Sequence, residues 1–91
     1  MNQSVLFSDL QEWNTQHICI DFPAQVQGAN IQCRIGLASL VRISNSVLNA
    51  NDHNISVKAL ALFDDYRFDI EEEVEMLIAQ EAFDEHGRIT L

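Results

Sequence analysis

The chain has 91 residues, 47% of them hydrophobic, and a formal net charge of −9 at pH 7. This length and composition predict one folded domain, residues 1–91, and argue against a disordered chain. The charge argues against a nucleic-acid-binding or anionic membrane surface, because such surfaces need clustered bases and the five bases here are scattered along the sequence.

The N-terminus, MNQSVLFSDL, lacks the basic start and long apolar run of a signal peptide. No apolar segment approaches the roughly 20 residues that a membrane-spanning helix needs. We therefore expect a cytoplasmic protein.

The N-terminal region begins with an apolar segment, residues 5–7, that must pack somewhere in the fold. The spacing of Asp9 and Glu12 matches that of a capping box and predicts a single helical turn around Leu10. Trp13 is the only tryptophan, and we expect it to lie in the core or to cover it.

Alternation of apolar and polar residues predicts two β-strands, over residues 17–22 and 29–35. Gln27 and Gly28 lie between them, and Gly28 can adopt the positive φ of a tight turn. The strands are therefore expected to form an antiparallel hairpin with one apolar face. Pro23 cannot donate a sheet hydrogen bond, which predicts that the first strand is an edge strand near this residue.

A short helix is predicted over residues 37–44, because Leu37, Leu40, Val41 and Ser44 have helical spacing. Gly36 ends the preceding strand. Residues 44–54 are rich in Ser, Asn and Asp and indicate a loop.

Residues 56–83 contain no Gly or Pro and are predicted to form one long amphipathic helix. One face is apolar, with Leu60, Phe63, Ile70, Val74, Leu77 and Ile78 at three- and four-residue steps. The opposite face is acidic, with Asp64, Asp65, Glu71, Glu72 and Glu75.

The ends of this helix are predicted from capping residues. The candidate N-caps are Asp52, Asn54 and Ser56. Gly87, after His86, is the predicted stop, with Gly supplying a left-handed C-cap. Residues 88–91 then form a short terminal strand that could join the sheet.

A helix of this length would be about 40 Å long, whereas a compact domain of this size is only about 30 Å across. The helix must therefore overhang, bend or break, and only the weak helix formers around Asp64 and Asp65 favour a break. We expect the overhang to be covered by the N-terminal segment or by a second copy of the chain, so a homodimer is one expected arrangement.

Several residues, taken in order and spacing, resemble a known family. They are Phe7, Trp13, Phe22, Gly28, Cys33-Arg34-Ile35, Leu40, Phe63-x-x-x-Arg67-x-x-Ile70 and Gly87-Arg88-Ile89. Together they resemble the bacterial domain-of-unknown-function family 1488. The resemblance implies a stand-alone α+β domain from a bacterium, and it brings no catalytic residues because none is assigned to that family.

Arg67 is the first candidate binding residue, because on a helical wheel it falls inside the apolar stripe. An arginine there needs an acidic or carbonyl partner, or must reach water along its stem. A structural tie to Asp21, Glu81 or a backbone carbonyl is one interpretation. The other is an anchor for an anionic ligand, since a guanidinium pairs bidentately with carboxylates and phosphates.

His17, Cys19 and Asp21 are predicted to share the polar face of the first strand. They contain the residue types of Cys–His catalysis, but same-face neighbours on a strand lie about 6.6 Å apart. As metal ligands they lack a fourth partner and any CxxC or HxxH spacing, so no metal and no cofactor is predicted. The alternation puts Cys33 on the opposite face from Cys19, which argues against a disulfide.

The acidic helix face offers one further candidate. Glu71, Glu72, Glu73 and Glu75 point outward around a helix and are interpreted as solvated surface rather than a cation site. Phe68 falls at the centre of this face, where it could contact a partner or a second copy of the chain.

The sequence thus predicts a two-layer α+β fold, in which a hairpin and a C-terminal strand pack against one short and one long helix. The predicted function is a cytosolic interaction or regulatory module without enzymatic activity, with an unidentified protein partner. The alternative is a small enzyme or ligand-binding domain with Arg67 as anion anchor. A third hypothesis is nucleic-acid mimicry by the acidic face.

Overall fold

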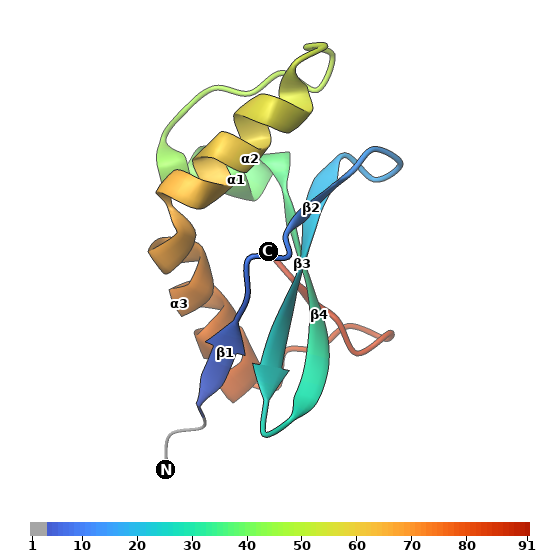
Figure 1. Cartoon of the computed structure of the whole chain (residues 1–91), viewed down its shortest axis with the longest axis vertical. Helices are drawn as coiled ribbons and strands as arrows, with labels where there is room; N and C mark the ends of the chain where they lie inside the picture. The colour runs from blue at the N-terminus through green and yellow to red at the C-terminus, as the bar shows by residue number, and fades with distance from the viewer. Residues whose placement is uncertain (1–3) are drawn as a thin grey trace.

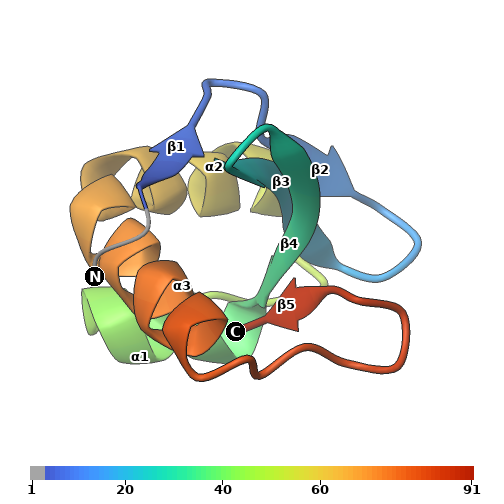
Figure 2. The ribbon, with the colours of Figure 1, turned by 90° about the horizontal axis from the view of Figure 1, so that it is seen from below.

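The computed structural model describes residues 4–91, which form an α+β fold with one mixed sheet and helices on its concave side (Figures 1 and 2). In this part of the chain the strands are β1 (Val5–Phe7), β2 (Glu12–Asn14), β3 (Cys19–Val26), β4 (Ala29–Gly36) and β5 (Ile89–Thr90). The helices are α1 (Leu37–Ser44), α2 (Ile55–Asp65) and α3 (Arg67–Ala79). The predicted α+β class is confirmed, and the molecule is elongated, measuring 42 × 23 × 21 Å.

The β3–β4 hairpin forms as predicted, with longer strands than the alternation indicated. Gln27 and Gly28 both have positive φ, 52° and 84°, which is the geometry of a two-residue type I′ turn. This turn sets the register, and the inward cross-strand pairs are Ile20 with Ile35, Phe22 with Cys33 and Ala24 with Ile31. The apolar side chains therefore share the face that the helices cover.

The sheet order is β1-β3-β4-β5, and β2 also pairs with β3. β3 is thus an internal strand, so the prediction of an edge strand is wrong. Close to Pro23, however, one edge of β3 has no strand of residues 4–91 beside it, as expected from Pro23. β1 pairs with residues from Ala24 to Val26, and β2 pairs with residues from Cys19 to Asp21. Pro23 lies in the gap between them, where no strand of this part of the chain is present to accept a hydrogen bond, so the absence of its N–H costs the sheet nothing.

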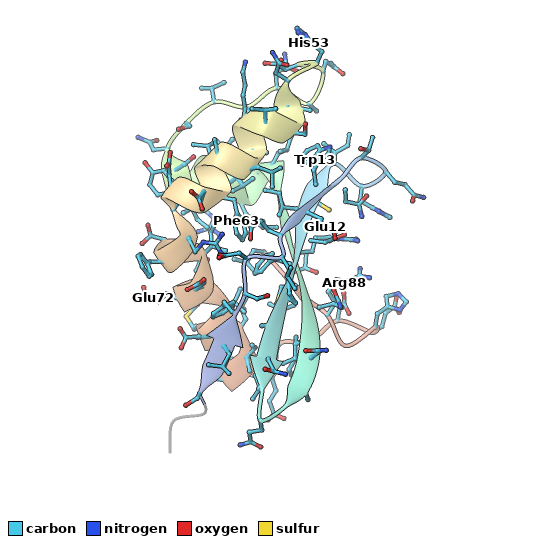
Figure 3. The ribbon with its side chains drawn as sticks, viewed as in Figure 1. Glu12, Trp13, His53, Phe63, Glu72 and Arg88 are labelled. Carbon is cyan, nitrogen blue, oxygen red and sulfur yellow. The ribbon has the colours of Figure 1, made fainter. Side chains whose placement is uncertain are left out.

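The hydrophobic core lies between the hairpin and the helices. Phe63 projects from α2 towards the sheet (Figure 3), and its ring meets the edge of Phe22 with centroids 5.0 Å apart. Trp13 is half-buried against the core, as expected of a residue that covers it. The fully buried members of the core are Ile20, Phe22, Ala24, Cys33, Ile35, Leu40, Ala59, Phe63, Ile70, Val74, Ile78 and Ile89.

The predicted single helix over residues 56–83 is wrong, because it is broken into α2 and α3 at Tyr66. Tyr66 has φ −111° and ψ 25°, outside the helical region, although its N–H still bonds to Leu62 and its carbonyl still accepts from Ile70. The premise of an overhanging rod, on which the expected homodimer rested, therefore does not hold.

The break falls directly after Asp64 and Asp65, the weak helix formers at which the sequence favoured one. The buried positions on either side of it are Ala59, Phe63, Ile70, Val74 and Ile78. On a straight helix these five would span an arc of about 100°, which is an ordinary width for a stripe that faces a core. The break therefore divides the rod without being needed to turn these side chains towards the sheet.

The C-terminal end of α3 also differs from the prediction. The helix ends at Ala79, and Glu81 rather than Gly87 supplies the left-handed residue, with φ 55°. Glu81 N–H bonds to the Ile78 carbonyl and Ala82 N–H to the Leu77 carbonyl, at 3.0 and 2.9 Å, which is a Schellman motif. Gly87 has φ 74° but serves the turn before β5.

Smaller elements were predicted with mixed success. The helix over residues 37–44 is confirmed, and the terminal strand joins the sheet parallel to β4, with Ile89 beside Cys33. The helical turn around Leu10 is wrong, because residues 8–11 connect β1 to β2 without helix. Asn54 is the N-cap of α2, but without a side-chain hydrogen bond.

A search of the described helices finds none whose length and apolar character would let it cross a bilayer.

The Schellman motif predicts a stabilising substitution at Glu81. A side chain with Cβ is strained at φ 55°, so Glu81→Gly should raise the free energy of unfolding by about 0.5–1 kcal/mol. Urea unfolding with a shared m-value would measure this change. Glu85→Gly, in the following exposed turn, is the matched control and should not stabilise, because it only adds freedom to the unfolded chain. Equal effects of both changes would contradict the assignment.

Candidate functional site

An open groove of about 810 Å³ lies at the end of the molecule where the β3–β4 hairpin turns. Figure 1 shows the hairpin turn, the start of β1 and the C-terminal end of α3 together at this lower end. The groove is lined by Val5, Val26, Ala29, Ile31, Glu75, Met76, Ile78, Ala79, Glu81 and Phe83.

The groove exists because the helical layer stops before the sheet does. Val26, Ala29 and Ile31 continue the inward-facing positions of the hairpin towards its tip. α3 ends at Ala79, and the Schellman motif then turns the chain away from the helix axis. The apolar sheet face near the hairpin tip is therefore only partly covered, and Met76 and Phe83 border it with 50% and 41% of their surfaces exposed.

Charge on the groove has one sign. Glu75 and Glu81 are the charged residues that line it. No base of residues 4–91 lines the groove, and the ion pairs formed elsewhere include Arg34 with Asp21 at 2.8 Å, Arg42 with Glu73 at 3.0 Å, and Lys58 with Asp52. The groove is thus an apolar surface with an acidic rim, and a cationic partner would not meet a like charge there.

The predicted cluster of His17, Cys19 and Asp21 is brought together only in part. His17 lies in the exposed turn before β3, where its backbone N–H bonds to Asn14 Oδ1 at 2.9 Å. Asp21 accepts hydrogen bonds from Arg34 Nε and Asn14 Nδ2, both at 2.8 Å, and the Cys19 thiol lies 3.8 Å from Asp21 Oδ1. The result is a polar tie across β2, β3 and β4.

These contacts change the pKa values of Asp21 and Cys19. Partial burial opposes ionisation of Asp21, but hydrogen bonds from Arg34 and Asn14 outweigh it, so the pKa of Asp21 lies below its usual value. Burial and the neighbouring Asp21 carboxylate raise the pKa of the Cys19 thiol. A nucleophilic cysteine needs the opposite shift, so Cys19 and Asp21 form a structural tie rather than an activated thiol.

The two cysteines are separate, buried and free. Cys19 pairs across the hairpin with Gly36, and Cys33 pairs with Phe22. Cys33 belongs to the core, and burial raises the pKa of its thiol to about 12. The prediction that they lie on opposite faces agrees with this register.

Arg67 is held by acids, although not by the predicted Asp21 or Glu81. Its guanidinium lies 3.5 Å from Asp64, 3.6 Å from Asp9 and 3.8 Å from Glu71, measured between the nearest nitrogen and carboxylate oxygen. Its Cζ also lies 5.1 Å from the centroid of the Phe63 ring, in cation–π geometry. With 19% of its side chain exposed and three carboxylates nearby, Arg67 is already surrounded by anions.

Glu71 is the least exposed of these three acids, with 19% of its side chain exposed, and its partial burial differs from the predicted solvated surface. Burial raises the pKa of Glu71 above its usual value, while Arg67 acts in the opposite direction. Arg67 therefore compensates a carboxylate that the fold keeps partly out of water.

Phe68 lies on the surface of α3 with 85% of its area exposed, as the helical wheel predicted. Glu72 points away from the sheet on the same helix (Figure 3). Glu73 differs from the predicted solvated surface, because it is half-buried and pairs with Arg42.

A second, shallower hollow of about 230 Å³ lies where β3 is unpaired, bordered by Asp21, Pro23 and Gln32. Neither hollow is lined by Arg67 or His17. Among residues 4–91, no three His, Cys, Asp or Glu side chains converge in a geometry suited to a metal ion.

The groove itself was missed by sequence reasoning. Ala29 and Ile31 lay in a predicted strand and Met76 and Phe83 in the predicted long helix, while Val26 lay outside both predicted strands. The only available signal was an apolar strand face that ran further than a helix ending at Ala79 could cover. That signal was hidden because the helix was predicted to continue to residue 83.

Loss of the Asp21 carboxylate should destabilise the fold in a pH-dependent way. A lowered pKa means that ionised Asp21 stabilises the protein above its unfolded pKa, near 3.9, and loses this effect as pH falls through the folded value. Asp21→Asn should therefore cost about 1–2 kcal/mol at pH 7 and less below pH ~4. Urea unfolding across pH 3–7 measures it. Asp65→Asn, at an exposed position, is the control, and a deficit for Asp21→Asn that does not change with pH would contradict the prediction.

Removal of the Arg67 charge tests whether this residue is structural. Arg67→Met keeps an apolar stem near Phe63 but leaves Glu71 uncompensated, so we expect a loss of about 1–2 kcal/mol at pH 7. The raised pKa of Glu71 means that protonation relieves the penalty, so the loss should shrink towards pH 4. Unchanged stability in urea would instead favour Arg67 as a ligand anchor.

Comparison with known proteins identifies the family. Residues 5–91 match the model of the family described as "Protein of unknown function (DUF1488)". The chain is 35% identical over 92 residues to "Uncharacterized protein YrdB" of Escherichia coli (strain K12), covering 100% of this chain and 99% of that protein. The protein of the same name from Shigella flexneri is 34% identical, with the same coverage.

A solved structure gives the same result at the level of the fold. The crystal structure of a protein of unknown function from Shewanella loihica PV-4, at 1.60 Å resolution, has a TM-score of 0.86 and 44% sequence identity. The match covers 100% of this chain and 94% of that one. The resemblance inferred from the sequence is therefore confirmed, and the chain belongs to the DUF1488 family, whose relatives named here come from bacteria.

Proposed function

We propose that the chain is a single-domain interaction module of the bacterial cytoplasm, without enzymatic activity, that binds a protein partner through the groove. The observation that carries this proposal is the apolar sheet face left open between the hairpin tip and α3, with Met76 and Phe83 exposed beside it. Most of its walls belong to the β3–β4 hairpin and α3, so this part of the surface is preformed.

The polar residues support this reading over catalysis. Asp21 is engaged with Arg34 and Asn14, the pKa of the Cys19 thiol is raised, and His17 is exposed in a separate turn. The buried free cysteines suit a reducing compartment, which supports the cytoplasmic location. The net charge of −9 supports a protein partner over a nucleic acid.

Three alternatives remain as hypotheses. A ligand-binding domain or enzyme with Arg67 as anion anchor is disfavoured by the three carboxylates around that arginine. A homodimer through Phe68 is favoured by its 85% exposure but would bring two acidic faces together. Nucleic-acid mimicry by the acids of α3 would use the same face and the same basic class of partner.

The proposal predicts that one change in the groove abolishes partner capture. Immobilised wild-type protein, Met76→Lys and Val57→Lys would be incubated with bacterial lysate, and bound proteins quantified by mass spectrometry. Both substitutions exchange an exposed apolar helix residue for Lys, but only Met76 lines the groove. A partner should be retained by the wild type and by Val57→Lys and reduced about tenfold or more by Met76→Lys, as expected for a central interface residue.

Phe68→Lys separates the alternatives in the same experiment. If Phe68→Lys loses the partner while Met76→Lys keeps it, the acidic face is the docking surface and the groove proposal is wrong. If no protein distinguishes Met76→Lys from Val57→Lys, the groove is not an interface.

A further inference from the structure

We infer that the groove takes an extended peptide segment, with apolar residues at alternate positions and basic residues at its ends, that adds as a strand to the free edge of β1. This inference rests on the proposed function and names the chemistry of its partner. It follows from three features of the described residues: an unpaired sheet edge, an apolar groove beside it, and a rim of one charge.

The first feature is the position of β1 at the end of the sheet. The strand order begins with β1, which pairs with β3 through Val5, Leu6 and Phe7 and with no other strand in residues 4–91. Its outer edge therefore presents backbone N–H and carbonyl groups without a strand partner. Such an edge is a template for an added strand, and recognition by strand addition uses it in this way.

The second feature is that the two faces of β1 suit an alternating sequence. Val5 faces inward and lines the groove, opposite Met76 and Ile78 of α3. Leu6 faces outward and is 62% exposed. In a strand laid beside β1, alternate side chains would enter the groove, and the intervening ones would lie next to Leu6.

The third feature selects a basic partner over a second copy of this chain. Glu75 and Glu81 are the charges on the groove, and neither makes a salt bridge within the described residues. A second copy would bring its own net charge of −9. A segment with Lys or Arg flanking its apolar residues would meet the rim with opposite charge.

The size of the site fits this occupant. The volume of about 810 Å³ lies in the range of ligand-binding clefts. β1 has three residues and offers only a few hydrogen bonds, so side chains in the groove must supply most of the affinity. A strand of typical length, about five or six residues, would span the site.

Selection from a displayed library of random peptides, each about 12 residues or twice a typical strand, tests the inference directly. Peptides that bind the wild type but not Met76→Lys would be sequenced. We expect apolar residues at every second position, with Lys or Arg at the ends of this run, and a loss of about tenfold or more in affinity for Met76→Lys but not for Val57→Lys. Amide exchange of residues 5–7 should slow when peptide binds.

N-methylation of the best peptide gives the signature of strand addition. In an added strand only every second N–H points at β1. Methylation of one alternate set of amides should therefore abolish binding, and methylation of the other set should not.

Five outcomes would overturn the inference. Apolar residues at helical spacing would mean that the groove takes a helix, and equal effects of both methylation sets would mean that the peptide does not pair with β1; the proposed function would stand in both cases. If Met76→Lys loses a partner from the lysate but no peptide that depends on the groove is selected, the proposed function would also stand. Self-association abolished by Met76→Lys would mean that a second copy fills the groove. No groove-dependent binder in either experiment would remove both proposals.

Discussion

The register of the β3–β4 hairpin is the constraint on which the other elements depend. Because the Gln27-Gly28 turn pairs Phe22 with Cys33, one face of the hairpin is apolar and receives Phe63. A slip of one residue would expose this face and would place Asp21 and Arg34 in the core. The same register sets Asp21 opposite Arg34 on the outer face, so a single turn fixes both the core and the polar tie.

Local signals in the sequence were sufficient for the hairpin, the short helix and the α+β class. Alternation, a Gly in a tight turn and helical spacing are all encoded within a few neighbouring residues, as in residues 27–28 and 37–44. The break at Tyr66 was only partly predictable in this way, because no Pro or Gly marks it and the weak helix formers Asp64 and Asp65 are the local signal beside it. Phe63 and Ile70, seven residues apart, would share one face of a straight helix too, so the apolar stripe does not reveal the break.

The candidate site also has some features that the sequence predicted and others that it did not. The exposure of Phe68 and the partial burial of Arg67 followed from a helical wheel. Helical spacing could also have indicated Asp64 and Glu71 as partners of Arg67, whereas Asp9 comes from a distant connection. The groove depends on where α3 stops relative to the hairpin tip. This difference has two causes: Glu81 ends α3 in a left-handed conformation that is usual for Gly, and β4 extends beyond that point. Neither feature is marked by a sequence motif.

The gap at Pro23 has a consequence for the dynamics of the sheet. Because β1 and β2 pair with separate parts of β3, the hydrogen bonds of one strand do not reinforce those of the other. β1, with three residues beside the groove, can detach in a sub-global fluctuation while the rest of the sheet stays intact. The wall of the groove that carries Val5 is therefore held in the sheet by one three-residue pairing, and occupancy of the groove would be coupled to its ordering.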